Sequence, residues 1–204
     1  MRRVSRILRA VLFTVVFTFI MVNWHEIGHT VVARILGDTS ARYALYQATS
    51  HNTCAGCNLY NSATLSDSAN IVVNSGGVLF TQLLAWAAIL LMAFAPARIA
   101  PGWTLWIVIA ITWLGDFVYQ LVQGLTNGVP INLPRGPEMS YTDFTAVIWF
   151  ARHATGWPVE TLRIILIVGA ILYSGLLAFT ALWAVKRRGS LSRGRAAVQV
   201  QRTT

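Results

Sequence analysis

The chain has 204 residues, of which 55% are hydrophobic and 11% are charged, and its formal net charge is +9 at pH 7. A soluble domain usually carries about 25% charged residues, so this composition excludes an ordinary soluble domain and indicates a membrane protein. The basic residues gather at the two ends, in MRRVSRILR and KRRGSLSRGR. This distribution favours contact with anionic lipid headgroups and argues against nucleic acid as a partner.

Four apolar runs are long enough to cross a bilayer, which takes about 20 apolar residues. They cover about residues 10–36, 69–95, 103–125 and 162–185. Because every backbone polar group must be satisfied inside lipid, each run is expected to be a helix. The sequence therefore predicts an all-α membrane protein, with a single integral-membrane domain over residues 1–185 and a disordered basic tail over 186–204.

The basic residues also predict how the chain is oriented. Most of them lie in the N-terminal segment, the 96–102 loop and the tail, so the positive-inside rule makes both termini cytoplasmic. Compactness and arginine usage favour a bacterial plasma membrane. Residues 38–68 then form a polar outer loop, and residues 126–160 include DFTAVIWFARHATGW, which is expected to be an extracytoplasmic amphipathic helix on the membrane surface.

The first span carries HEIGH, an H-E-x-x-H pattern, at residues 25–29. On a helix His25 and His29 share one face and can hold one zinc ion, while Glu26, about 100° round the helix, can act as general base. His25 lies ~22 Å along the helix from Ala10, in the outer third of a ~30 Å hydrocarbon core. Ionisable residues at that depth are typical of function; the alternative is a polar helix end at the interface.

A catalytic zinc site usually has three protein ligands, and the third span offers Asp116 at a matching depth. Asp116 lies ~20 Å from the start of its span at Trp103, and that span contains no Lys or Arg to pair with it. An unpaired buried carboxylate favours a metal. Two alternatives stay open. Asp116 is protonated or bonded to Gln120 or Gln123, or Asp143, otherwise a helix N-cap, is the third ligand.

The second span descends from outside and places Asn74, Gly76 and Gly77 near the depth of the histidines. The glycines allow either close helix approach or an opened backbone that a substrate strand could meet. Asn74 is predicted to bond a substrate carbonyl or to help hold an oxyanion, the alternative being a polar residue at a helix start. These three residues form the expected substrate-binding set.

Three motifs in chain order resemble the site-2 protease family of intramembrane zinc metalloproteases: HEIGHTVVARILG, NSGGVLFTQLLAW and LGDFVYQ. The resemblance implies zinc ligands at His25, His29 and Asp116 and a base at Glu26. It also implies that the substrate is the transmembrane segment of another membrane protein. The chain reads Leu-Gly-Asp where the family reads Leu-Asp-Gly, has no upstream Asn-x-x-Pro segment and has no PDZ-like domain. It therefore resembles a small, divergent member.

The two cysteines, Cys54 and Cys57, lie in the outer loop. In an oxidising compartment a disulfide between them is expected. The alternatives are a second metal site that includes His51, and thiol redox chemistry.

The leading prediction is an intramembrane zinc metalloendopeptidase whose partners are a transmembrane protein substrate and membrane lipids. One alternative is a non-catalytic metal-binding membrane module that binds partner helices. The other is a metal transporter, which would need polar residues across the full bilayer thickness. The inner halves of the spans offer almost none. No oligomeric state is predicted.

Overall fold

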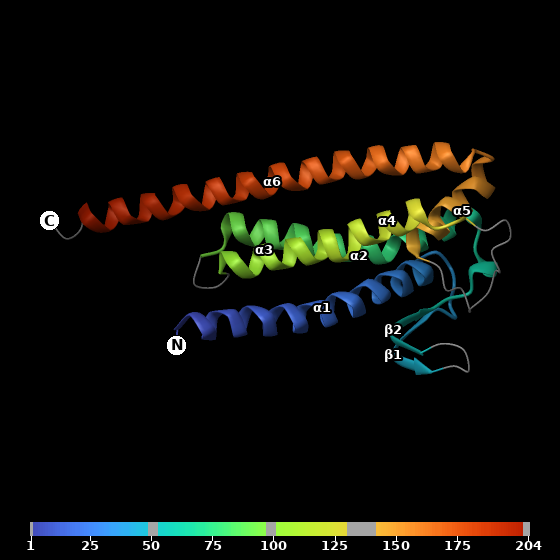
Figure 1. Cartoon of the computed structure of the whole chain (residues 1–204), viewed down its shortest axis with the longest axis horizontal. Helices are drawn as coiled ribbons and strands as arrows, with labels where there is room; N and C mark the ends of the chain where they lie inside the picture. Colours follow the sequence, from blue (N-terminus) through green and yellow to red (C-terminus); the bar gives the residue numbers. More distant parts are fainter. Residues whose placement is uncertain (1, 49–52, 97–100, 130–141, 202–204) are drawn as a thin grey trace.

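Four long helices form the body of the protein. The computed structural model describes residues 2–48, 53–96, 101–129 and 142–201. Within these ranges, four helical segments are long and apolar enough to cross a membrane: Ile7–Ile35, Asp67–Phe94, Gly102–Thr126 and Val159–Ser190. They lie side by side, and the first begins at the same end of the bundle at which the last finishes (Figure 1). The predicted helical membrane architecture is therefore confirmed.

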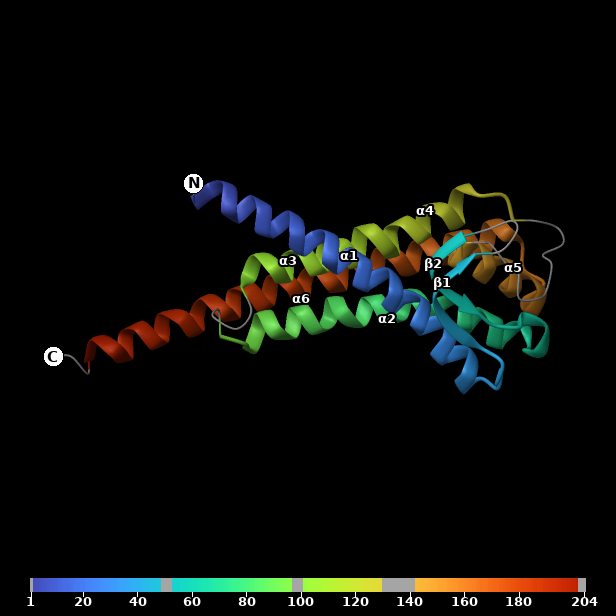
Figure 2. The same ribbon diagram turned by 90° about the horizontal axis from the view of Figure 1, so that it is seen from below.

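The first span, α1 (Arg2–Ile35), is covered by protein only toward its C-terminus. No described side chain before Met21 is buried, and from there on the buried positions recur along one face. Seen from below, α1 crosses the other spans obliquely (Figure 2). The helix stops at Gly37, whose φ of 108° lets the Asp38 N–H reach the Ala33 carbonyl at 3.0 Å. This is the Schellman arrangement that commonly closes helices.

The second span, α2 (Asp67–Phe94), crosses α1 at a pair of glycines. A Cβ added to Gly28 would lie 2.6 Å from the Gly76 carbonyl oxygen, so only glycine permits this approach. The Trp24 indole closes the same crossing by donating to the Phe80 carbonyl at 2.9 Å. Because α2 is unbroken, the glycines serve close helix approach, and the opened backbone is not found.

The segment between these spans contains a β-hairpin that the composition did not predict. β1 (Arg42–Ala48) and β2 (Thr53–Leu59) pair antiparallel, and the short 3-10 turn η1 (Ser62–Thr64) follows. The Tyr43 hydroxyl donates to the Asn23 side chain, which holds the hairpin against α1. The helical architecture therefore carries a small sheet at its outer-loop end.

The third span is made of three consecutive helical pieces. α3 (Gly102–Ala110) and α4 (Tyr119–Thr126) flank η2 (Ile111–Val118), which is a π-helix and contains Asp116. π-helical turns are rare and are frequently found at functional sites. On the N-terminal side of η2, α3 packs with α2 and the last span in an apolar core that includes Met92, Ile109 and Leu177.

The predicted amphipathic helix is α5 (Asp143–Thr155). Its apolar face, which was expected to lie on the membrane, instead packs against α2 and α4. Phe144, Ile148 and Phe150 are among its buried residues. Gly156, with φ of 74°, caps the helix C-terminus. The packing places Asp143, the first residue of α5, inside the protein.

The last span, α6 (Val159–Gln201), continues as a helix well beyond the other three (Figure 1). The tail that was expected to be disordered is therefore helical as far as Gln201. No proline interrupts this part of the chain, and extending an existing helix needs no new nucleation. Near the end of the bundle the Arg187 guanidinium lies 4.2 Å from the centre of the Phe94 ring.

Candidate metal centre

Three buried side chains converge on one point between α1 and α5. His25 Nε2 and His29 Nε2 lie 3.1 Å apart. The Asp143 carboxylate approaches both, with Oδ2 2.9 Å from His25 Nε2 and Oδ1 3.2 Å from His29 Nε2. Among the described residues these three make up the group of His, Cys, Asp and Glu side chains whose ligand atoms lie close enough to share an ion.

The other nitrogen of each ring shows which tautomer the structure favours. His29 Nδ1 lies 2.7 Å from the Val73 carbonyl oxygen, which can only accept, so Nδ1 carries the proton. His25 Nδ1 lies 3.0 Å from Asp116 Oδ1, a carboxylate that also favours a proton on Nδ1. Both Nε2 lone pairs then point at each other and at the Asp143 oxygens. Such an arrangement is repulsive unless protons or a cation occupy its centre.

The separations fit a zinc ion. Ligand atoms about 2.0–2.1 Å from a tetrahedral zinc lie roughly 3.3 Å from one another. The two Nε2 atoms are 3.1 Å apart, and each lies 2.9 or 3.2 Å from a different oxygen of Asp143. Asp143 Oδ2 is buried without a hydrogen bond from any described residue. A Cβ added to Gly77 would lie 2.4 Å from both Nε2 atoms. The donor set and the space beside it therefore suit a small cation.

Asp143 reaches the histidines because α5 begins against α4. Gln120 Oε1 accepts the Asp143 backbone N–H at 3.1 Å. Gly124 lets Phe144, the residue after Asp143, approach so closely that a Cβ added to Gly124 would lie 2.7 Å from it.

Burial acts to raise the pKa of Asp143. When the two imidazoles are protonated and no metal is bound, their charge and contacts outweigh burial and hold the pKa of Asp143 well below its usual range. The carboxylate is therefore ionised at neutral pH.

Asp116 lies beside the centre and outside the group of three. Its Oδ1 faces His25 Nδ1, the ring nitrogen turned away from His29, and its Oδ2 accepts a hydrogen bond from the Thr81 hydroxyl. The expected partners Gln120 and Gln123 bond elsewhere: Gln120 to Asp143 and Gln123 to Asn127. The structure brings Asp143, the rival candidate, to the Nε2 atoms in place of Asp116.

Glu26 lies next to the centre and is only half-buried. Its Oε2 accepts the backbone N–H of Asn58, in β2, at 3.1 Å. The Thr30 hydroxyl donates to the Asn58 side chain at 3.1 Å, one turn further along α1. Glu26 is also close enough to His29, His25 and Asp143 to interact with their charges. The hairpin thus fixes one carboxylate oxygen of Glu26 near the three converging side chains.

Asn74 does not have the free amide hydrogens that an oxyanion donor needs. Its Nδ2 donates to the Tyr60 hydroxyl at 2.9 Å and to the Asn70 carbonyl at 2.8 Å. Tyr60 accepts that bond, and no acceptor for its own proton is found in the described part of the chain. Burial raises the pKa of Tyr60 to about 12, with Asp143 adding to the effect. Tyr60 therefore keeps its proton at neutral pH.

The remaining expected residues are two glycines of α2 and the cysteines of the outer loop. Gly76 lies at the crossing with α1, and Gly77 faces the imidazoles. Cys57 is disulfide-bonded, and the one other cysteine in the sequence is Cys54, whose side chain lies outside the described residues. His51 lies outside them too.

Sequence reasoning missed four polar residues of this site: Asn58, Tyr60, Thr81 and Gln82. One signal was present for Thr81, because it lies four residues after Gly77 and thus on the same face of α2. Asn58 lies in the hairpin and Tyr60 directly after it, and this hairpin was not expected. Gln82 lies on α2 and bonds the π-helix, which was not expected either.

No family model, no curated protein and no solved structure matches this chain.

Proposed function

We propose that this chain is an intramembrane zinc metalloprotease that hydrolyses a peptide bond in or near the transmembrane segment of another membrane protein. The observation that carries the proposal is the convergence of His25 Nε2, His29 Nε2 and the Asp143 carboxylate within 3.2 Å of one another. The glycine that leaves room beside them supports it. The resemblance of the three motifs to site-2 proteases points to the same chemistry.

In this proposal His25, His29 and Asp143 hold the metal. Two neutral imidazoles and one carboxylate form a common three-ligand set that leaves a fourth position open. A zinc ion on these ligands would lower the pKa of a coordinated water toward ~7 and polarise a substrate carbonyl. Asp143 thereby takes the place that the sequence had suggested for Asp116.

Glu26 acts as the general base. It follows His25 directly, so its carboxylate projects about 100° round the helix from that ligand. It takes a proton from the attacking water as the water oxygen bonds to the carbonyl carbon. It then gives the proton to the amine nitrogen as the C–N bond breaks. The hydrogen bond from Asn58 holds one of its oxygens and leaves the other for this transfer.

Tyr60 supplies a hydrogen bond to the carbonyl oxygen as negative charge develops there. Its hydroxyl is fixed by Asn74 and stays protonated at neutral pH. A preorganised donor of this kind typically contributes about 10²–10³ in rate. Asn74, expected to act on the substrate itself, instead acts through Tyr60.

The substrate class follows from where the centre lies. His25 and His29 are inside the Ile7–Ile35 span, so a peptide must reach them from the bilayer or from its outer surface. An extended backbone is required, because the peptide bonds of an intact helix are shielded by its own side chains.

The test uses purified full-length protein and four variants: Glu26→Gln, Asp143→Asn, Tyr60→Phe and, as a matched control, Glu160→Gln on the exposed start of α6. Bound zinc is measured by elemental analysis, and cleavage is measured on a panel of single-span proteins in liposomes. Wild type and Glu160→Gln should hold about one zinc per chain and cleave. Glu26→Gln should keep zinc and lose cleavage by about 10²–10⁴.

The other two variants separate metal binding from catalysis. Asp143→Asn should lose both zinc and cleavage, and Tyr60→Phe should keep zinc while its kcat falls. A wild-type protein that holds zinc but cleaves no member of the panel would favour the metal-binding module. Zinc uptake into sealed liposomes, at a rate that Glu26→Gln does not change, would favour the transporter. A folded wild-type protein that binds no zinc would exclude the protease, the metal-binding module and the metal transporter alike.

A further inference from the structure

The carboxylate of Asp116 contacts the side of His25 that faces away from the metal centre. One oxygen lies 3.0 Å from His25 Nδ1, and the other accepts from the Thr81 hydroxyl. The residue is 4% exposed, so water cannot substitute for either contact. An imidazole that binds a metal through Nε2 usually donates its Nδ1–H to a carboxylate or carbonyl. Asp116 lies next to that position for His25, at 3.0 Å from Nδ1 but without hydrogen-bond geometry, and the Val73 carbonyl occupies it for His29.

The π-helix explains how Asp116 reaches His25. A π-helical turn accommodates one more residue than an α-helical turn, and one residue corresponds to ~100° of rotation on an α-helix. If residues 111–118 were α-helical, Asp116 would be turned away from α1 by an angle of about this size. The orientation of this carboxylate therefore depends on the wide turn.

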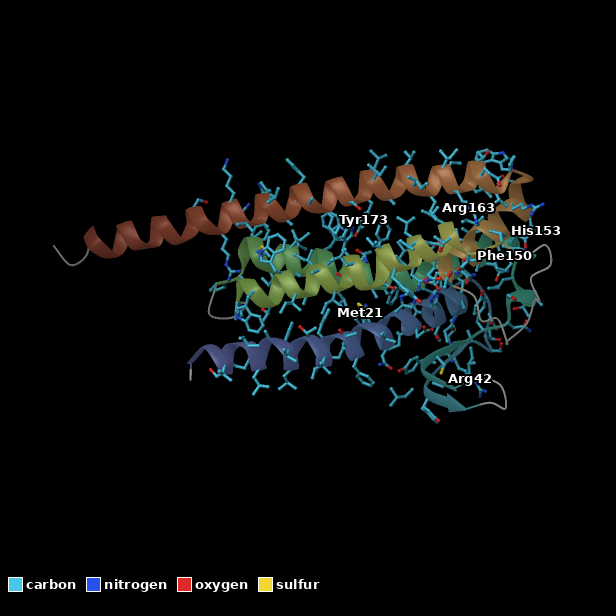
Figure 3. The ribbon with its side chains drawn as sticks, in the orientation of Figure 1. Met21, Arg42, Phe150, His153, Arg163 and Tyr173 are labelled. Atoms are coloured by element: carbon cyan, nitrogen blue, oxygen red, sulfur yellow. The ribbon has the colours of Figure 1, made fainter. Side chains whose placement is uncertain are left out.

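Side chains from two other spans hold the wide turn in place. Gln82, on α2, donates from Nε2 to the Thr112 carbonyl at 2.8 Å. The Tyr173 hydroxyl, on α6, donates to Gln82 Oε1 at 2.8 Å. Tyr173 lies on the side of α6 that faces the other spans (Figure 3). Gln82 and Thr112 are both buried, so breaking their contact would leave polar groups unsatisfied in an apolar bundle.

We infer that Asp116 is a positioning residue for the metal ligand His25. Thr81 and the π-helical turn, which Gln82 bonds, hold the Asp116 carboxylate where it contacts His25. The inference rests on the proposed metal centre. Asp116 fixes the ring orientation and keeps the proton on Nδ1, so Nε2 presents its lone pair to the ion. Removing such a partner typically weakens metal binding by about 10–100-fold without removing a ligand.

The experiment measures metal affinity and ligand set separately. Zinc affinity is obtained by competition with a chelator. The visible absorption of Co²⁺ in place of zinc reports the number and kind of ligands. The variants are Asp116→Asn, Asp116→Leu, Thr81→Val, Gln82→Leu and Asp143→Asn. Trp113→Phe is the matched control, because it removes a partly buried 3.1 Å hydrogen bond of the same span, to Ser174, that does not involve Asp116.

Wild type and Trp113→Phe should bind alike. Asp116→Asn, whose amide oxygen still accepts from Nδ1–H, should bind about tenfold more weakly, and Asp116→Leu about 100-fold more weakly. Both should keep the wild-type Co²⁺ spectrum. Thr81→Val and Gln82→Leu should fall between wild type and Asp116→Leu. Asp143→Asn should lose the spectrum.

Two results would overturn the inference. The first is loss of the Co²⁺ spectrum in Asp116→Asn with retention in Asp143→Asn, which would make Asp116 the ligand. The second is wild-type affinity in Asp116→Leu. A wild-type protein that binds neither metal would instead count against the proposed function, so the two failures are distinguishable.

Discussion

Gly77 is the residue that leaves space beside the two imidazoles. Its missing side chain faces His25 Nε2 and His29 Nε2 from α2, while the Asp143 carboxylate contacts the same two atoms. Since α1 and α2 are fixed to each other one residue away, at Gly28 and Gly76, neither helix can move aside for a larger residue.

Gly77→Ala should therefore weaken zinc binding by about 100-fold or more, at or beyond the upper end of the range for changes next to metal ligands. The new Cβ would lie 2.4 Å from both Nε2 atoms and would push the rings apart. The control is Gly169→Ala, because no atom lies within 4 Å of a Cβ added there. Equal zinc affinity in the two variants would show that the ion binds elsewhere.

Asp38 stabilises the loop that follows α1. Its Oδ2 accepts the Asn61 N–H at 2.6 Å, and its Oδ1 accepts the Ser40 N–H at 2.9 Å. Burial acts to raise the pKa of Asp38, but these hydrogen bonds and one from the Ser40 hydroxyl together lower it below its ordinary value. A carboxyl group with a lowered folded-state pKa stabilises the fold fully above its unfolded-state pKa, about 3.9. That stabilisation is lost as the pH falls through the folded-state value.

We expect Asp38→Ala to lower the free energy of unfolding of metal-free protein by about 1–2 kcal/mol at pH 7. The difference from wild type should shrink as the pH falls below about 4. Thermal unfolding in detergent at a series of pH values measures it. A difference that grows toward acid pH would contradict the direction of the pKa shift.

The residue-level prediction from sequence was strong where spacing along one helix decides contact. His25 and His29 must share a face because they are four residues apart, and the structure places them together. The choice between Asp116 and Asp143 depended on packing between helices. Depth in the bilayer favoured Asp116, yet both carboxylates reach His25, and only the structure shows that they meet opposite nitrogens of its ring.

At the level of elements, the position of α5 decides whether Asp143 can reach the histidines. The first turn of α5 rests on Gly124 of α4, which has no side chain to keep Phe144 away. The contact is close enough that even a methyl group requires one helix to move.

Gly124→Ala should displace the start of α5 and weaken zinc binding about tenfold. Gly128→Ala is the matched control four residues later, since a Cβ there meets nothing within 4 Å. The comparison is made by chelator competition on both purified variants. If the two bind zinc with the same affinity, the register between α4 and α5 does not position Asp143.

The spans were predictable as elements because length and hydropathy are enough to identify a helix in lipid. The hairpin was not, because its polar sequence forms strands only when α1 is beside it to bond Tyr43 and Asn58. The π-helix also left no readable mark, since its sequence, ITWLGDFV, continues the apolar run of the third span. Local sequence pattern therefore predicts where the spans lie, but it predicts neither the hairpin between them nor the π-helix within one of them.

For the whole molecule, the arrangement in Figure 1 constrains topology. α1 begins and α6 ends at one end of the bundle, and the hairpin and α5 lie at the other. Both termini therefore lie on one side, and the basic residues near them lead us to propose that this side is cytoplasmic. A disulfide at Cys57 is the state that this orientation predicts, because the hairpin would then lie in an oxidising compartment.

A green fluorescent protein fused to the C-terminus of the full chain should therefore fluoresce, because it folds in the cytoplasm. The same reporter fused after Gly128, beyond the third span, should be exported and stay dark. Fluorescence of whole cells, normalised to the amount of each fusion in the membrane, measures the difference. The opposite pattern would invert the orientation.

The uneven covering of α1 links the site to the membrane around it. The helix is clamped to α2 at Gly28, whereas no described side chain before Met21 is buried and that part would be largely lipid-facing in a membrane. Helices adapt to a bilayer that is too thin or too thick by tilting, and here only the lipid-facing part is free to do so. Gly28 lies between His25 and His29, so we expect a change in the tilt of α1 to alter how both rings meet the Asp143 carboxylate on α5.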